Sequence, residues 1–406
     1  MRRRAAFTVL CFLYLFASAS AYAQCVGPAQ SAVQSAISSA SAGSTVTVCA
    51  GTVSWSGGIS FSGISLVGAG SSTSGTVITA GQVTMNKHAT QLTRMSGFRF
   101  TGSDTHLNVN GKVSQYPYRV DNNYFAMGSD FQILFNSNGG VIDHNTFDCG
   151  STSNIVDTMG LHPGQSNEWS LPTTFGTADT NGTTNIYFET NTMKHCSVGL
   201  DGDDGSRPVI RYNQMQSSAI VFHGTQPNDS TALSTGGGAR QFEVYNNTFS
   251  VIDTVNDNIP QGWVWARGES GVIANNTMAN NNTSQYGGKP NILLTVGCNQ
   301  SGHTTYPVPY QVGQAAVTSS EPEDPPTHPV LIFGNSGAGI GISVAGQGGT
   351  GGGTYDCSNP SNFIQASRDY YTSNHWNWTP YTYPHPLVAG QSTSVGPPTN
   401  LAATVQ

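Results

Sequence analysis

A short phrase recurs along the chain, made of an apolar residue, two further residues, an asparagine, one more residue and a final Phe or Met. Its apolar residues alternate with polar ones, and a period of two predicts a strand rather than a helix. Degenerate copies, MSGFRF (95–100) and IFGN (332–335), extend the series at both ends. The full copies are VDNNYF (120–125), IDHNTF (142–147), FETNTM (188–193), IRYNQM (210–215), VYNNTF (244–249) and IANNTM (273–278).

The spacing of the phrase predicts a solenoid. Successive asparagines lie 22, 46, 22, 34 and 29 residues apart, which indicates a basic period of 22 lengthened by insertions. Leucine-rich repeats have a similar length, but this chain lacks their Leu at fixed positions. We predict an all-β, single-stranded, right-handed parallel β-helix whose coils stack at about 4.8 Å. The asparagine at one corner of each coil would hydrogen-bond to its copies in the neighbouring coils, although NNT and HNT could also be simple polar turns.

Both ends of the chain carry their own signals. Residues 1–23 begin with three Arg, continue with a mostly apolar run and end in a small-x-small triplet, which is typical of a signal peptide. Residues 28–40 have apolar positions at helical spacing, which predicts a short N-terminal helix capping the solenoid. We expect one β-helix domain over 24–390 and a Pro-led tail or linker over 391–406. The protein is expected to be secreted, extracellular or on the cell surface.

The cysteines are expected to form disulfides, because an even number, six, remains after the expected signal peptide. The 46-residue gap reads as one coil with a long loop, since 160–184 holds no further copy of the phrase. Cys149 and Cys196 would then lie in adjacent coils at ~4.4–6.8 Å between Cα atoms. No cysteines form a close pair of the kind that binds zinc. The predicted pairs are Cys25–Cys49, Cys149–Cys196 and Cys298–Cys357.

The charge and hydropathy of the chain exclude some classes of partner. Charged residues make up 9% of the chain, and the formal net charge is −7. Without a basic block beyond the first residues, nucleic acid is not an expected partner. No segment after the signal peptide is apolar over the ~20 residues that a membrane span needs. We expect a monomer that acts on an extracellular polysaccharide.

The chain resembles a known superfamily. TVTVCAGTVSW (45–55) and GISFSGISLVGAG (58–70), followed by the asparagine coils, look like secreted bacterial proteins of the pectate-lyase-like right-handed β-helix superfamily. ARQFEVYNNTF (239–249) and RGESGVIANNT (267–277) are similar to one branch of it, mostly without assigned activity. The resemblance covers roughly 25–390 and implies the fold. It leaves the chemistry open, because the superfamily includes lyases, hydrolases, esterases, epimerases and adhesins.

Residues at the same position in successive coils of a solenoid form a column on one face. Titratable residues are rare in this chain, and several of them fall in one such column. Asp201 and His223 each follow a phrase asparagine by ten residues, so we expect them side by side on adjacent coils. Arg267 comes next if 253–262 is an insertion, and Asn136 lies on the coil below. The loops 160–184 and 225–240 would wall a groove around them. The alternative is an ordinary polar stack on a solvent-facing surface.

This column fits a polysaccharide lyase. Histidine is a residue type that exchanges protons near neutral pH, so His223 is the natural base, while Arg267 would neutralise a uronate carboxylate. A calcium ion held by Asp201, Asp203 and Asp204 could do the same, since carboxylate oxygens are suitable ligands. Substrate contacts are expected from Asn136, Trp169, Trp265 and Arg240. The aromatic residues of 376–383 are instead expected to cover the flank or end of the solenoid.

Two other functions remain open. Asp201 with Asp203 or Asp204 could act as the carboxylate pair of a glycoside hydrolase, ~6.5–9.5 Å apart in an inverting enzyme. The Asp pair followed by His223-Gly224 resembles polygalacturonases, but their Asn-x-Asp and Arg-x-Lys elements are missing. A non-catalytic adhesin or glycan-binding solenoid would keep the repeat without a catalytic column. We expect a secreted lyase that cleaves an acidic polysaccharide by β-elimination, with these functions as alternatives.

Overall fold

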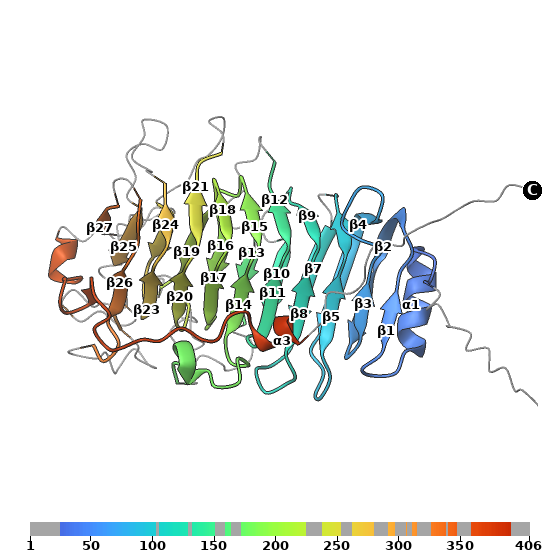
Figure 1. Cartoon of the computed structure of the whole chain (residues 1–406), viewed down its shortest axis with the longest axis horizontal. Coiled ribbons are helices and arrows are strands. Elements are labelled where there is room, and N and C mark those ends of the chain that lie inside the picture. The colour runs from blue at the N-terminus through green and yellow to red at the C-terminus, as the bar shows by residue number, and fades with distance from the viewer. Residues whose placement is uncertain are drawn as a thin grey trace, which may run out of the picture.

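The structure is a computed structural model in which every paired strand is parallel, and its strands build a parallel β-helix (Figure 1). This confirms the predicted fold class. The strands form two long sheets that run the length of the molecule. The residues described are 25–102, 105–128, 132–150, 159–163, 172–224, 238–252, 262–279, 291–296, 306, 311–314, 326–337, 340–346 and 359–390.

The first sheet has 11 strands in sequence order, one from each coil. They are β1 (Thr45–Thr47), β3 (Ser65–Val67), β5 (Thr93–Ser96), β8 (Tyr118–Asp121), β11 (Gly140–Asp143), β14 (Ile186–Glu189), β17 (Pro208–Arg211), β20 (Phe242–Tyr245), β23 (Gly271–Ala274), β26 (Val330–Phe333) and β28 (Tyr370–Tyr371).

The second sheet contains two rows of strands. The row directly after the asparagine corner is β6 (Phe98–Phe100), β9 (Tyr124–Ala126), β12 (Thr146–Asp148), β15 (Thr192–Lys194), β18 (Gln214–Gln216), β21 (Thr248–Ser250) and β24 (Thr277–Met278). The third row of each coil is β7 (Thr105–Asn110), β10 (Ile133–Asn136), β13 (Met159–Leu161), β16 (Val198–Gly202), β19 (Ala219–Phe222), β22 (Val264–Ala266), β25 (Ile292–Val296) and β27 (Ile342–Gly346). The long strands β2 (Gly51–Ser62) and β4 (Thr76–Asn86) belong to both rows.

Few helices accompany the sheets in the described residues. The predicted N-terminal helix is α1 (Gln30–Ser39), and it covers the end of the solenoid beside β1 and β2 (Figure 1). Its buried residues, Val33 and Ile37, are four positions apart and therefore share one face. The remaining helical turns are η3 (Gly176–Ala178), η6 (Pro360–Asn362) and α3 (Pro386–Ala389).

The asparagines of the phrase form a buried ladder at one corner. Nδ2 of Asn145 donates to Oδ1 of Asn191 at 3.1 Å, and the backbone N of Asn145 donates to the same oxygen at 2.9 Å. The same pair of hydrogen bonds joins each asparagine to the next, and Asn335 of the degenerate copy ends the series. The residue before each asparagine has a positive φ, as at His144 (55°). The ladder members are Asn123, Asn145, Asn191, Asn213, Asn247, Asn276 and Asn335.

The last residue of each phrase packs inside the coils. Phe100, Phe125 and Phe147 stack with ring centroids 5.0 and 5.2 Å apart and planes 3° from parallel. Met193 continues the column, in register with Phe147. The Phe-or-Met preference of the phrase is therefore a requirement of one continuous apolar core.

Two of the three predicted disulfides are present. Cys25 and Cys49 are bonded near the N-terminal cap, and Cys149 and Cys196 join adjacent coils with their Cα atoms 5.2 Å apart. The predicted pair Cys298–Cys357 lies outside the described residues, as do 1–23 and 391–406. Strand β12 pairs with β15, so the 46-residue gap is one coil with a long insertion, as predicted. Disulfides of this kind are typical of an oxidising compartment.

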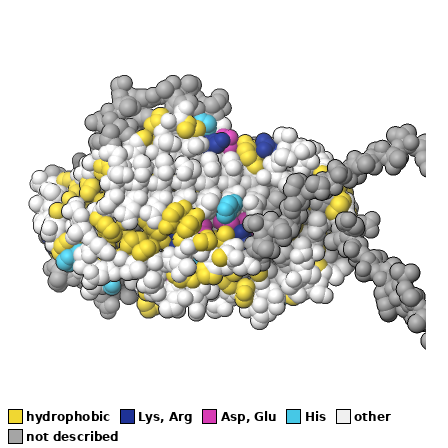
Figure 2. Space-filling model, in the orientation of Figure 1, with side chains coloured by type: hydrophobic (Ala, Val, Ile, Leu, Met, Phe, Trp, Pro, Cys, Tyr) yellow, Lys and Arg dark blue, Asp and Glu magenta, His cyan; other side chains and the backbone are white. Residues whose placement is uncertain are grey.

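The C-terminal segment runs back along the first sheet, below β23 to β11, and ends in α3 beside β8 and β11 (Figure 1). Arg211 holds it by donating to the carbonyls of Tyr381 at 2.8 Å and Thr382 at 2.9 Å. Trp378 packs on Tyr245 at 5.0 Å between centroids and donates to Glu243 at 2.7 Å. The aromatic residues thus cover the flank, as predicted. Figure 2 shows hydrophobic side chains gathered in a row along this face.

In the described part of the chain, no helix is long and apolar enough to cross a membrane.

Candidate functional site

One column of polar residues follows the ends of the third-row strands. Asn86, Asn110 and Asn136 are direct partners in β4, β7 and β10. The column then passes through the positions just after β13, β16, β19 and β22, because Leu161 pairs with Gly202, Gly202 with Phe222 and Phe222 with Ala266. Those positions are His162, Asp203, His223 and Arg267.

The register differs from the sequence prediction at Asp201. Asp201 pairs with Val221, so the residue opposite His223 is Asp203. Two more residues lie between β15 and Asp201 than in the equivalent part of the next coil. One lies before Val198, and the other is at the irregularity in β16 between Val198 and Leu200. Asp201 and His223 therefore lie on adjacent coils, as predicted, but their register positions differ by two residues.

The side chains meet nevertheless. Nε2 of His223 lies 3.1 Å from Oδ1 of Asp201, and Nδ1 of His223 lies 3.4 Å from Oδ2 of Asp203. The first distance is that of an ion pair. The imidazole thus has a carboxylate beside each ring nitrogen.

A second histidine, missed by the sequence analysis, faces the same carboxylate. Nε2 of His162 lies 3.6 Å from Oδ2 of Asp201, and Nδ1 of His162 lies 3.7 Å from Oδ2 of Asp204. His162 follows β13, the strand inside the long insertion that carries no asparagine phrase. The only sequence signal is the string MGLH (159–162), an apolar strand end followed by a titratable residue, like IVFH (220–223).

Arg267 lies on the other side of His223. Its Nη1 is 3.1 Å from Nε2 and 3.3 Å from Nδ1 of the imidazole, and it can donate to whichever ring nitrogen lacks a hydrogen. The guanidinium also lies 5.0 Å from the ring centroid of Trp265. The indole of Trp265 donates to the Thr295 hydroxyl at 2.9 Å. These contacts fix the cation at the edge of the acid–base cluster.

The carboxylates of the cluster have opposite pKa shifts. Burial raises the pKa of Asp201, but the charge of His223 and contacts with both histidines lower it more, so its pKa falls well below the ordinary value. Burial raises the pKa of Asp203 to about 6; the charge of His223 opposes this shift, and those of Asp201 and Asp204 add to it. Opposite shifts in neighbouring carboxyls are typical of an acid and its charged partner.

The pKa of His162 is also shifted. Burial lowers its pKa, but contact with Asp201 and the charges of Asp201, Asp203 and Asp204 raise it more, so the net pKa is above the ordinary value. Side-chain exposure in the cluster is 15% for His223, 19% for Asp203 and 2% for Asp201. A substrate can therefore reach His223 and Asp203, while Asp201 lies beneath them.

The predicted calcium ligands do not converge on one point. The nearest oxygens of Asp201, Asp203 and Asp204 each face a histidine nitrogen. Within the described ranges, no three His, Cys, Asp or Glu side chains are arranged to hold a metal ion. The residues as placed do not fit calcium.

The other predicted substrate contacts have different positions. Asn136 is half-buried in the column, and its Nδ2 donates to Oδ1 of Asn110 at 3.0 Å. Arg240 is 2% exposed, too buried to contact a polymer at the surface. Its charge acts instead on the buried Glu269, whose pKa burial raises well above the ordinary value. Trp169 lies outside the described residues.

The predicted groove walls are only partly described, since 164–171 and 225–237 lie outside the described residues. Within 172–184, Phe175 packs on Trp376 at 5.2 Å between centroids. The backbone N of Gly176 donates to Glu243 at 2.8 Å. That segment therefore covers the first sheet, while walls formed by 164–171 and 225–237 stay a prediction.

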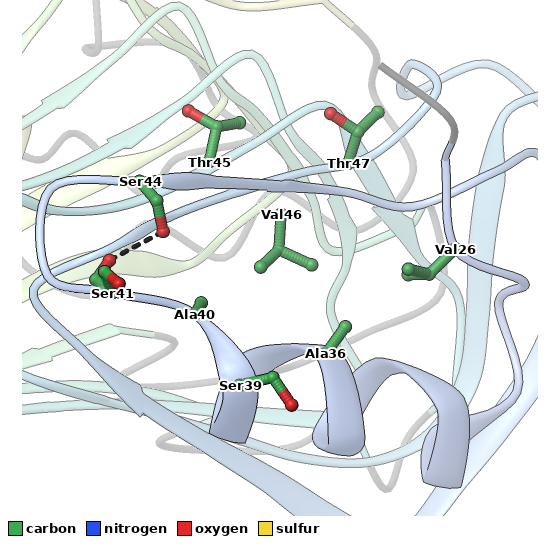
Figure 3. A pocket seen from close by; sticks show the side chains of 9 residues that line it. All are labelled: Val26, Ala36, Ser39, Ala40, Ser41, Ser44, Thr45, Val46 and Thr47. Carbon is green, nitrogen blue, oxygen red and sulfur yellow. Dashed lines mark hydrogen bonds between the residues drawn. The ribbon is translucent and has the colours of Figure 1, made fainter.

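A pocket of about 390 Å³ lies at the N-terminal end of the solenoid, between α1 and β1 (Figure 3). Val26, Ala36, Ala40 and Val46 give it apolar walls, and its remaining lining side chains are Ser and Thr. It contains no titratable group, so it offers no acid–base chemistry. We place the candidate active site at the His223 cluster, where such groups converge.

Comparisons with known proteins add little to this geometry. No family model matches the sequence, and no curated protein matches it. Among solved structures, the chain is similar to ORF18 of Geobacillus virus E2, with 13% identity and a TM-score of 0.37. That similarity covers 79% of this chain and 60% of the viral one, so the chain spans about 60% of the length of the protein it matches. The site is therefore interpreted from its own residues.

Proposed function

We propose that this protein is a polysaccharide lyase that cleaves an acidic polymer by β-elimination at the His223 cluster. The observation that carries the proposal is the position of Arg267, whose Nη1 is 3.1 Å from Nε2 of His223. β-Elimination beside a uronate needs a base for the C5 proton and a cation for the carboxylate next to it. His223 and Arg267 supply both from adjacent coils.

The remaining groups complete the reaction. His223 takes the C5 proton while Arg267 pairs with the carboxylate and stabilises the charge that develops on it. The C4–O bond then breaks, a C4–C5 double bond forms, and Asp203 gives its proton to the leaving oxygen. A pKa of about 6 keeps a useful fraction of Asp203 protonated in mildly acidic solution. Asp201, between His223 and His162, orients the base.

A glycoside hydrolase is the second candidate. It is favoured by the opposite pKa shifts of Asp201 and Asp203, the pattern expected of a charged carboxylate and a general acid. In that reaction Asp203 would protonate the glycosidic oxygen, and Asp201 would stabilise charge or activate water. Asp201 is almost fully buried, which favours the lyase, where it needs no contact with the sugar.

Product analysis tests the proposal. The purified protein is incubated with pectins of different esterification, alginate, glucuronan and neutral glycans, each with calcium or with chelator. A lyase gives ultraviolet absorbance from the unsaturated uronate together with new reducing ends. Reducing ends without absorbance would support hydrolysis, and glycan binding without either product would leave an extracellular binding solenoid.

A further inference from the structure

The column that reaches the His223 cluster begins as a row of amides. Asn86, Asn110 and Asn136 occupy one register position at the ends of β4, β7 and β10. A second row runs two residues earlier, in which Ser60 pairs with Thr84 and Thr84 with Asn108. Residues two apart on a strand share a face, so these hydroxyls and amides lie on one outer surface. We call this surface the amide face.

The amide face carries no formal charge. The strands β2, β4, β7 and β10 contain no Lys, Arg, Asp or Glu. The nearest lysine, Lys87, is 4% exposed, and its Nζ donates to the carbonyl of Asn138 at 2.8 Å. Lys112 lies in the turn after β7, outside both rows. The cation of the proposed site, Arg267, stands several coils away.

Hydrogen-bonding capacity on this surface is only partly used. Nδ2 of Asn136 donates to Oδ1 of Asn110 at 3.0 Å. Within the residues that the structure describes, Nδ2 of Asn110, Oδ1 of Asn136 and the Asn108 amide have no protein partner. Amides can both donate and accept, as sugar hydroxyls do. A uronate carboxylate would instead call for a cation.

We propose that the amide face binds neutral sugar residues of the polymer that the His223 cluster cleaves. Coils spaced at about 4.8 Å present one amide for roughly each pyranose ring of an extended chain. The substrate is then a heteropolysaccharide whose acidic residue at Arg267 is followed, toward the N-terminal coils, by neutral sugars. Where the polymer is cleaved relative to the amide face rests on the proposed function. The binding of neutral sugars to the amide face does not.

Binding can be measured without turnover. The His223→Ala variant of the full chain is titrated with hexasaccharides of galactan, glucomannan and xylan, and separately with hexagalacturonate. We expect at least one neutral probe to bind more tightly than hexagalacturonate. Adding Asn108→Ala and Asn110→Ala should weaken that binding by at least about tenfold, since two hydrogen-bonding groups are lost.

A matched control is the pair Thr248→Ala and Gln214→Ala, which removes polar groups from the outer positions of β21 and β18. It should leave binding unchanged. Thermal unfolding checks that both double variants are folded. If the alanine variant is unfolded, Asn110→Asp, which keeps the side-chain size, replaces it in the test and should also weaken binding. The proposal is overturned if no neutral probe binds, or if binding survives loss of both amides.

The outcomes also separate this inference from the proposed function. Neutral binding that depends on Asn108 and Asn110, without cleavage of any polymer, would keep the amide face and remove the lyase. Cleavage whose kcat/KM on long chains is unchanged by Asn108→Ala and Asn110→Ala would keep the lyase and remove the amide face.

Discussion

Asp201 and His223 approach each other to 3.1 Å although their strand positions are two residues out of register. The imidazole comes from the residue after β19, and the carboxylate from the middle of the neighbouring β16. Asp203, which is in register with His223, contacts the second ring nitrogen at 3.4 Å. The two extra residues between β15 and Asp201 therefore let one histidine contact two carboxylates of different pKa, one buried and one accessible.

The pH dependence of cleavage should follow Asp203. Its pKa of about 6 means that the acid form is lost as pH rises through that value, so kcat/KM should fall on the alkaline side. Asp203→Asn cannot give a proton, and we expect it to lower kcat by about 10²- to 10⁴-fold. Initial rates across pH 4–8 check this. An alkaline limb that persists in Asp203→Asn would show that another group is the acid.

Removing one asparagine should weaken the whole ladder. Asn191→Ala leaves two buried donors of Asn145 without their acceptor and removes the hydrogen bond to Asn213. We expect a loss on the order of 3 kcal/mol in the free energy of unfolding, because unsatisfied buried donors are costly. Denaturant unfolding measures it, with Thr248→Ala on the outer surface as the control. Equal stability of the two variants would contradict a structural role for the ladder.

The disulfide between Cys149 and Cys196 should affect both stability and the site. It closes a loop of 47 residues, and the entropic model gives about 4 kcal/mol for a loop of that length. Cys196 precedes the irregular strand β16, so Cys149→Ser with Cys196→Ser should also lower cleavage. The matched pair Cys25→Ser with Cys49→Ser, far from the cluster, should reduce stability alone. Equal loss of activity in both double variants would contradict this local effect.

Glu243 should make the C-terminal segment less stable as pH rises. Burial raises its pKa from 4.5 to about 7, against hydrogen bonds from Gly176 and Trp378. The folded state then binds more protons than the unfolded state between those values, so stability is full below pH 4.5 and falls by about 3 kcal/mol up to pH 7. Glu243→Gln should remove this slope, at the cost of one accepted hydrogen bond. An unchanged slope in free energy of unfolding against pH would refute it.

His385 should have the opposite effect. Burial lowers its pKa from 6.5 to about 4, and its Nδ1 accepts a hydrogen bond from the backbone N of Leu387, which requires the neutral ring. The unfolded chain binds the proton more readily, so stability is full above pH 6.5 and falls toward pH 4. His385→Asn should lose that dependence. The difference between variant and wild type across this window measures it, and a constant difference would contradict the assignment.

The sequence could predict whatever the repeat itself requires. Each ladder asparagine needs an identical residue at the same corner of the next coil, so the repeated phrase predicts the fold, and the ladder spacing then predicts Cys149–Cys196. Register after the corner could not be predicted, because the two extra residues before Asp201 carry no sequence signal. His162 was missed since its strand lacks the phrase. The ion pairs beneath the C-terminal segment, such as Glu189 with Arg211, depend on a cover supplied by distant residues.

The most direct test of the central claim is a kinetic isotope effect at C5 of the substrate. If His223 removes this proton, a uronate polymer deuterated at C5 should give unsaturated product measurably more slowly than the unlabelled polymer. His223→Ala and Arg267→Ala should form no such product while remaining folded. Unsaturated product without an isotope effect, or formed at full rate by His223→Ala, would contradict the assignment of His223 as the base.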